Sequence, residues 1–284
     1  MTTSPVIRFD GQVAVVTGAG RGLGAAYARL LATRGATVVV HDAGVAPDGG
    51  GFDPGVADGV VREITTRGGT AVACYENLET ASGCRNVIER AIERFRRIDI
   101  LIHNAGLVIF ASLEAIDTAM WNRMVNLGVQ SSFHLAQAVI PHMKRQRYGR
   151  IVLTTSGRAM RIADAAPGLV AYSVGKMAQL GLMVGVSAEI EGTDIRINAV
   201  SPVAATRMLR RRAPELLPEL VAPGVAFLAS SRCDFSGVVL RAAGGRFSAA
   251  HWRFTDEIDF GRMATEQETI AARWREIAGG PPAG

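Results

Sequence analysis

A glycine-rich turn between a short strand and a helix is the feature that most constrains the fold of this chain. Residues 12–17 form a β-branched run, which ends in the stretch Gly-Ala-Gly-Arg-Gly-Leu-Gly at 18–24. Apolar residues then recur with helical spacing as far as Leu31, Gly35 closes the helix, and a second β-branched run begins at Thr37. A strand, a glycine turn, a helix and a second strand within about thirty residues predict one βαβ unit.

The same alternation continues along most of the chain. Further strands are expected at 70–75, 100–104, 150–155, 195–200 and 238–241, with helices at 56–66, 84–95, 118–147 and 172–190. Alternating strands and helices predict an α/β fold, a doubly wound parallel sheet of the Rossmann type with helices on both faces. Because no change in composition divides the 284 residues, we expect a single domain, with 246–284 as a C-terminal extension.

Composition argues against several classes of protein. No run of about eighteen apolar residues is present, so we expect no membrane span, and residues 1–10 lack the features of a signal peptide. Cys74, Cys84 and Cys233 form no Cys-x-x-Cys pair, which predicts buried, reduced thiols and favours the cytoplasm. The net charge of +5 includes no dense basic block interleaved with aromatic residues, so we expect no nucleic-acid partner.

The glycine turn and Asp42 together predict a dinucleotide site. The glycines let the backbone approach a pyrophosphate at the N-terminus of the helix, although a tight turn without a ligand can have the same sequence. Asp42 follows the second strand, where a carboxylate accepts hydrogen bonds from the adenosine ribose and repels a 2′-phosphate. This favours NAD over NADP. Arg21 could instead meet a 2′-phosphate, or it could be a solvated arginine at the start of the helix.

Tyr172 and Lys176 form a second motif. Their four-residue spacing places a phenol and an ammonium on one face of a predicted helix. A tyrosine with a reference pKa near 10 exchanges protons poorly at neutral pH, and a neighbouring ammonium lowers that pKa by stabilising the phenolate. The same spacing also occurs on ordinary helix surfaces, so the prediction of a catalytic pair depends on the other motifs.

Taken together, these motifs resemble the short-chain dehydrogenase/reductase family. The matches extend from residue 12 to about 245 and comprise the turn at 17–24, Asn104-Ala105-Gly106, Asn126, Ser156, and Tyr172 with Lys176. The resemblance implies that Tyr172 is the general acid or base, and that Lys176 lowers its pKa and holds the nicotinamide ribose. It also implies that Ser156 hydrogen-bonds the reacting oxygen and that Asn126 supports a proton-relaying water.

The resemblance further implies cofactor contacts and partners. The expected cofactor-binding residues are Gly18, Arg21, Gly22, Leu23, Gly24, Asp42, Asn104, Ala105, Gly106, Tyr172, Lys176 and Pro202. A small-molecule substrate and assembly as a homodimer or homotetramer are expected, and no metal site is assigned.

This sequence departs from the family pattern at three places. Ser156 stands sixteen residues before Tyr172, so we expect a lengthened loop at 157–171, with Thr155 as a possible substitute for the serine. His103 replaces the first residue of the common Asn-Asn-Ala-Gly form, and we expect it to support the backbone or the packing. Pro202 is followed by valine instead of glycine.

Segments outside these motifs resemble the (3R)-hydroxyacyl-CoA dehydrogenase units within the family. They are 41–44, 142–151, 201–208, 221–223 and 244–253. The resemblance implies a 3-hydroxyacyl-CoA substrate, whose phosphates Arg210 and Arg211 could bind. No hydratase or lipid-carrier segment follows, so we expect the dehydrogenase unit alone. The alternatives are a dehydrogenase of steroids or other alicyclic alcohols, and a regulatory dinucleotide-binding protein without turnover.

Overall fold

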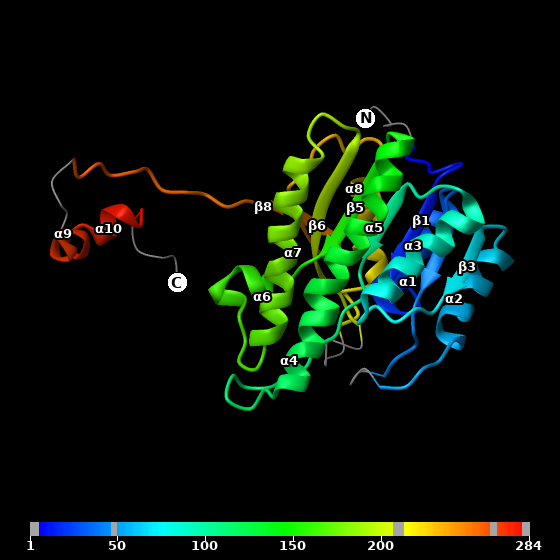
Figure 1. Ribbon diagram of the computed structural model, residues 1–284, viewed down its shortest axis with the longest axis horizontal. Helices are drawn as coiled ribbons and strands as arrows, with labels where there is room; N and C mark the ends of the chain where they lie inside the picture. The colour runs from blue at the N-terminus through cyan, green and yellow to red at the C-terminus, as the bar shows by residue number, and fades with distance from the viewer. Residues whose placement is uncertain (1–5, 47–49, 207–212, 262–265, 280–284) are drawn as a thin grey trace. The chain divides into compact units, whose positions relative to one another are not determined.

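The computed structural model describes residues 6–46, 50–206, 213–261 and 266–279 (Figure 1). The chain divides into two compact units, Met1–Ala249 and Ala250–Gly284. An eight-stranded sheet in the order β3-β2-β1-β4-β5-β6-β7-β8 organises the first unit. The arginine cluster that the sequence suggested for CoA phosphates, at 207–212, lies outside the described residues.

The strands follow the predicted β-branched runs closely. They are β1 (Val13–Thr17), β2 (Thr37–His41), β3 (Thr70–Cys74), β4 (Ile100–His103), β5 (Gly149–Thr154), β6 (Ile195–Val203), β7 (Val239–Ala243) and β8 (Arg246–Ala250). All the pairings from β3 through β7 are parallel, which confirms the doubly wound Rossmann-type sheet. Strand β8 was not predicted; it follows a two-residue turn in which Gly244 and Gly245 both have positive φ, the conformation that suits a tight hairpin.

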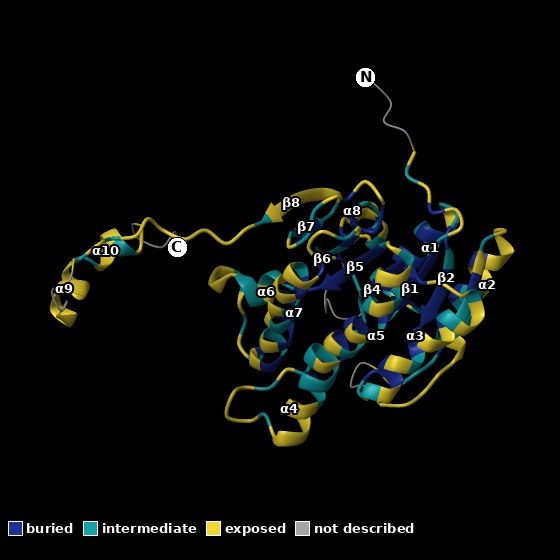
Figure 2. Cartoon of the chain, turned by 45° about the horizontal axis from the view of Figure 1, so that its top comes forward, coloured by how far each residue is buried: buried dark blue, intermediate teal, exposed yellow. Residues whose placement is uncertain are grey.

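Helices flank the sheet in two groups. The described helices of the first unit are α1 (Gly22–Thr33), α2 (Gly55–Thr66), α3 (Ala81–Phe95), α4 (Thr118–Val125), α5 (Ser131–Gln146), α6 (Gly157–Met160), α7 (Val170–Glu189) and α8 (Ala222–Leu228), with short 3₁₀ turns η2 (Ile162–Asp164) and η3 (Pro218–Leu220). Helix α1 packs with α2 and α8, whereas α5 packs with α3 and α7. Figure 2 shows the strands, mostly dark blue, between helices whose outer faces are yellow.

The long helix expected at 118–147 is interrupted. Between α4 and α5 the backbone forms a π-helix, η1 (Asn126–Gln130), in which the Ser131 amide donates to the carbonyl of Asn126, five residues earlier. Such turns insert one residue into a helix and are frequent at functional sites.

The carboxyl ends of the inner strands position the site. Strands β1, β4 and β5 are buried along their whole length, as their apolar β-branched sequences require. Thr17 at the end of β1 pairs with His41 of β2 on one side and with His103 of β4 on the other. The order of strands reverses between β1 and β4, and ligands bind at such switch points in doubly wound sheets.

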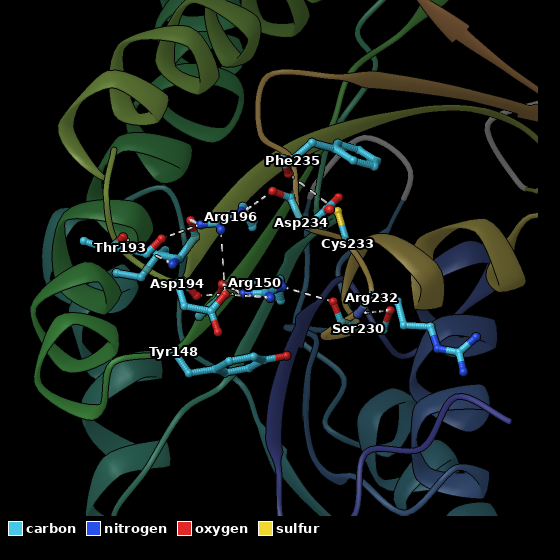
Figure 3. A network of polar contacts seen from close by, with 12 residues as sticks. Tyr148, Arg150, Thr193, Asp194, Arg196, Ser230, Arg232, Cys233, Asp234 and Phe235 are labelled. Carbon is cyan, nitrogen blue, oxygen red and sulfur yellow. Dashed lines mark hydrogen bonds and ion pairs between the residues drawn. The ribbon is translucent and has the colours of Figure 1, made fainter. Parts of the chain in front are cut away.

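A buried arginine ties β5 to neighbouring segments (Figure 3). Arg150, 1% exposed, donates to the carbonyl oxygens of Ser230, Gly149 and Asp194 at 3.0, 2.9 and 2.7 Å. Its guanidinium also contacts the Asp194 carboxylate at 2.9 Å and lies 4.5 Å from the centre of the Tyr148 ring. A guanidinium carries five N–H donors and stays charged, so it can satisfy several carbonyls at once.

The unit Ala250–Gly284 contains two short helices, α9 (Gln267–Ala272) and α10 (Trp274–Ile277). Within it, the Arg273 guanidinium lies 5.0 Å from the centre of the Phe260 ring and pairs with Glu276. Elsewhere the three cysteines are buried and free, as predicted. Among the described helices, none combines the length and the apolar character needed to span a bilayer.

Candidate active site

A pocket of about 440 Å³ lies at the carboxyl ends of the inner strands. Eight predicted cofactor-binding residues line it: Gly18, Arg21, Gly22, Leu23, Asp42, Asn104, Ala105 and Gly106. The other lining residues were not predicted and are His41, Ala43, Val45, Glu76, Asn77, Leu78, Glu79, Leu127, Ala205 and Thr206. Most of these follow β2, β3 or β6 directly, so their positions just after predicted strands were a usable signal.

The glycine turn leaves the start of α1 open to an anion. Gly18 has φ +63°, in the left-handed region that favours glycine, and the Asn104 side-chain amide donates to its carbonyl at 3.1 Å. No side chain caps the first turn of α1, so amides there remain available in the way that pyrophosphate binding requires. Gly24 does not line the pocket; a Cβ there would lie 2.1 Å from the Gly18 oxygen, so its role is close packing.

Two backbone amides hold the Asp42 carboxylate. One carboxylate oxygen accepts from the Gly20 amide at 2.9 Å and the other from the Gly44 amide at 2.8 Å. The side chain is therefore fixed at the edge of the pocket. Arg21 is exposed and lines the same pocket as Asp42.

The four-residue spacing of Tyr172 and Lys176 lies within α7, as predicted. Lys176 is 7% exposed, and its Nζ donates to the Thr154 carbonyl at 2.7 Å and lies 5.8 Å from the centre of the Tyr172 ring. Burial lowers the pKa of Lys176 to about 8. A Cβ added at Gly106, which lines the pocket, would lie 3.5 Å from Nζ, but Tyr172 and Lys176 are not themselves among the residues that line it.

The electrostatic influences on Tyr172 differ from those expected. Burial raises the pKa of Tyr172, while a hydrogen bond with the Ser156 side chain and the charge of Arg158 lower it. The spacing argument expected Lys176 to supply the lowering influence. In the free protein this influence comes instead from Ser156 and Arg158, which lie in the loop at 157–171 or just before it. That loop contains α6 and η2.

Ser156, not Thr155, is the residue whose side chain lowers the pKa of Tyr172. The Thr155 hydroxyl donates to the Lys176 carbonyl at 2.8 Å and is buried, so it anchors α7 to the end of β5. Ser156 caps α6, where its oxygen accepts from the Arg158 amide at 3.3 Å.

Two predicted residues are not brought to Tyr172 by their described contacts. The Asn126 side-chain oxygen accepts from the Gln130 side-chain amide at 3.0 Å, and the π-helix that contains Asn126 packs against α7. Its neighbour Leu127 lines the pocket and, like Tyr172, packs against the apolar cluster of Leu107, Met124 and Ala171. Pro202 lies within β6, and the pocket is lined by residues three and four positions later.

A family model for the short chain dehydrogenases matches residues 12–216. The chain therefore belongs to the short-chain dehydrogenase/reductase family, whose members are oxidoreductases acting on CH–OH groups. This match confirms the family to which the sequence motifs pointed.

Individual relatives narrow the comparison. The chain is 40% identical over 250 residues to peroxisomal multifunctional enzyme type 2 of Drosophila melanogaster, covering 86% of this chain but only 41% of that protein. It is 35% identical to a putative short-chain type dehydrogenase/reductase of Mycobacterium tuberculosis, covering 94% of this chain and 93% of that one. It is 33% identical to a 3-oxoacyl-[acyl-carrier-protein] reductase of Synechocystis, covering 77% of this chain and 89% of that protein. The chain thus spans about two fifths of the fly enzyme.

Solved structures share the fold. A short chain dehydrogenase from Mycobacterium avium superposes with a TM-score of 0.84 at 30% identity, covering 97% of this chain and 98% of that one. A 7α-hydroxysteroid dehydrogenase complexed with NADH and 7-oxo glycochenodeoxycholic acid gives 0.75 at 30% identity, covering 84% and 95%. A metagenomic short-chain oxidoreductase in complex with NADP gives 0.67 at 29% identity, covering 78% and 92%.

Proposed function

We propose that this protein is an NAD-dependent dehydrogenase that interconverts a secondary alcohol and a ketone. The observation that carries the proposal is the pair on α7, in which the buried Lys176 ammonium lies 5.8 Å from the centre of the Tyr172 ring and close to Gly106 of the pocket lining. A bound nicotinamide dinucleotide supplies hydride transfer. The Tyr172 hydroxyl gives or takes the proton of the reacting oxygen, Ser156 orients that oxygen, and Lys176 holds the nicotinamide ribose.

Replacement of Tyr172 tests this assignment. Tyr172→Phe removes only the hydroxyl, so kcat should fall at least about a hundredfold, as expected when general acid–base catalysis is lost, while NADH still binds. Tyr27→Phe is the matched control, because Tyr27 is buried and its hydroxyl has no described hydrogen-bond partner. A Tyr172→Phe enzyme that kept more than about a tenth of wild-type kcat would exclude Tyr172 as the acid–base residue.

NAD is the proposed cofactor because Asp42 is held at the pocket edge by two backbone amides. A fixed carboxylate repels a 2′-phosphate. NADH should bind more tightly than NADPH in fluorescence titrations, and Asp42→Ala should reduce the difference between the two affinities. Equal affinities in the wild type would indicate that Arg21 decides the preference, and Arg21→Ala would then weaken NADPH alone.

The proposed substrate is a 3-hydroxyacyl-CoA. Support comes from relatives named peroxisomal multifunctional enzyme type 2 and 3-oxoacyl-[acyl-carrier-protein] reductase. The resemblance to a 7α-hydroxysteroid dehydrogenase supports the alternative, a steroid alcohol. A 3-hydroxyacyl-CoA, the same acyl group on a truncated thioester, and a 7α-hydroxy bile acid should be compared by NADH formation. Turnover of the bile acid alone would favour the steroid assignment.

Three further features belong to this proposal. We propose that residues 246–284 extend one dehydrogenase domain, that the protein acts in the cytoplasm, and that it forms a homodimer or homotetramer. Helices α5 and α7 carry the exposed apolar side chains Phe133, Val174, Met177 and Val184, which a second copy could cover. Light scattering measures the assembly, and cell fractionation measures the location.

A further inference from the structure

His103, at the end of β4, connects two elements of the pocket wall. The imidazole is 1% exposed, and both ring nitrogens have hydroxyl partners. Nδ1 lies 2.9 Å from the Thr17 hydroxyl of β1, and Nε2 lies 2.9 Å from the Ser131 hydroxyl at the start of α5. The sequence predicted only that this residue supports the backbone or the packing.

The surrounding hydrogen bonds determine which nitrogen carries the proton. The Ser131 hydroxyl donates to the Leu127 carbonyl at 2.6 Å, so its oxygen accepts from His103 Nε2–H. The Thr17 oxygen accepts from the amides of Asn104 and Ala105, both at 3.1 Å, so its own proton is free to reach Nδ1. Burial, with a smaller effect from the charge of Lys176, lowers the pKa of His103 to about 3. The imidazole is therefore the neutral Nε2–H tautomer.

The Ser131 hydroxyl donates to the carbonyl that the Ser131 amide would use in an α-helix. In an α-helix, the Ser131 amide would pair with the Leu127 carbonyl, four residues earlier. Here that amide donates to the Asn126 carbonyl, and the Leu127 carbonyl accepts from the Ser131 hydroxyl instead. Because His103 donates to the same hydroxyl oxygen, the direction of the hydroxyl proton is set.

We propose that His103 and Ser131 form a positioning pair, which keeps η1 in its π register and so holds Leu127 in the wall of the cofactor pocket. Thr17 connects the other end of this chain of hydrogen bonds to Asn104 and Ala105, which line the same pocket. The pair thus joins the loop after β4 to η1. The site of action, Leu127, packs against the same apolar cluster as Tyr172.

The test rests on the proposed dinucleotide binding and uses the full-length protein. Ser131→Ala removes the hydroxyl, and His103→Asn keeps an acceptor for Thr17 but is too short to reach Ser131. Each should weaken NADH binding about fivefold, the loss typical of one buried hydrogen bond. The double variant should bind NADH no more weakly than either single variant, because both changes break the same hydrogen bond between His103 and Ser131.

Ser132→Ala is the matched control. Ser132 is equally buried, and its hydroxyl donates to the Gly128 carbonyl of the same π-helix at 3.1 Å. That carbonyl keeps a second donor, the Gln179 side-chain amide at 3.2 Å, and Ser132 does not contact His103. NADH affinity should stay within about twofold of the wild type. If Ser131→Ala and His103→Asn lower the melting temperature while NADH affinity is unchanged, the pair is only structural and the proposal is wrong.

Nitrogen-15 NMR of histidine-labelled wild type provides a readout that needs neither a variant nor turnover. His103 should show a protonated Nε2 and an unprotonated Nδ1, with no titration between pH 8 and pH 5. A protonated Nδ1, or a titration in that range, would overturn the proposal. Failure of the wild type to bind NADH would refute the proposed function instead, and the NMR result would still decide the hydrogen-bond pattern.

Discussion

Replacing Lys176 by methionine tests how much the buried ammonium destabilises the folded protein. Burial lowers its pKa from 10.5 to about 8, so between these pH values the unfolded chain binds more protons at this side chain than the folded protein does. The stability of the wild type should therefore rise, through this group, as the pH increases from 8 to 10.5. Below pH 8 the destabilisation is fully present.

The magnitude follows from the two pKa values. The difference between 10.5 and about 8 corresponds to about 3.4 kcal/mol, of which about 2.5 kcal/mol disappears between pH 7 and pH 10. Methionine has a similar length and no charge. The unfolding free energy of Lys176→Met, relative to the wild type, should therefore fall by about 2.5 kcal/mol over this range. The hydrogen bond to Thr154 adds a nearly constant offset, because an ammonium and an amine both donate.

Urea unfolding followed by circular dichroism at pH 7, 8, 9 and 10 measures this difference. The difference between the unfolding free energies of the variant and the wild type cancels the titration of all other groups, which the two proteins share. The same substitution at the exposed Lys144 controls for the loss of a lysine as such. Because Lys144 and Lys176 are the only lysines in the sequence, NMR of ¹³C-labelled lysine gives two signals and reports the pKa directly. A stability difference that does not vary with pH would refute the reasoning.

Three other substitutions test the site and the sheet. Ser156→Ala should raise the pKa of Tyr172, because the hydrogen bond that lowers this pKa is lost. The acidic limb of the pH–kcat profile for alcohol oxidation should therefore move to higher pH. An unshifted limb would contradict the role of Ser156. Arg150→Met should lower the unfolding free energy by about 3–5 kcal/mol, because several buried carbonyls lose their donor. Asp194→Asn changes a half-exposed side chain and should lower it by less than about 1 kcal/mol. Urea unfolding measures both, and equal losses would show that the exposed ion pair dominates.

The parts of the fold that sequence reasoning predicted depend on local chemistry. The glycine turn at 18–24 needs left-handed backbone at Gly18, and β-branched runs on either side favour strands. Asp42 follows the second strand immediately, so its place at the carboxyl edge of the sheet follows from the strand itself. The order of motifs along the chain then identified the family.

The parts that it missed depend on contacts between distant segments. The π-helix inserts one residue into a helix, and this hardly disturbs the apolar spacing from which a continuous helix was predicted. Its stabilising link, from His103 to Ser131, joins residues 28 positions apart in the chain. The assignment of Asn126 to the site remains a prediction, and its described side-chain contact is with Gln130.

The choice of lysine at 176 follows from these same contacts. Of the 31 lysine and arginine residues, only two are lysines, so a cation at a typical position in this chain is an arginine. An arginine at 176 would stay charged at any relevant pH, so its desolvation cost would not decrease as the pH rises above 8. A lysine with a pKa lowered to about 8 can release its proton near neutral pH, which lets the same side chain donate to the Thr154 carbonyl in either state. Burial beside the phenol of Tyr172 thus accounts for the lowered pKa of Lys176, and it connects the stability test at Lys176 to the proton transfer proposed for Tyr172.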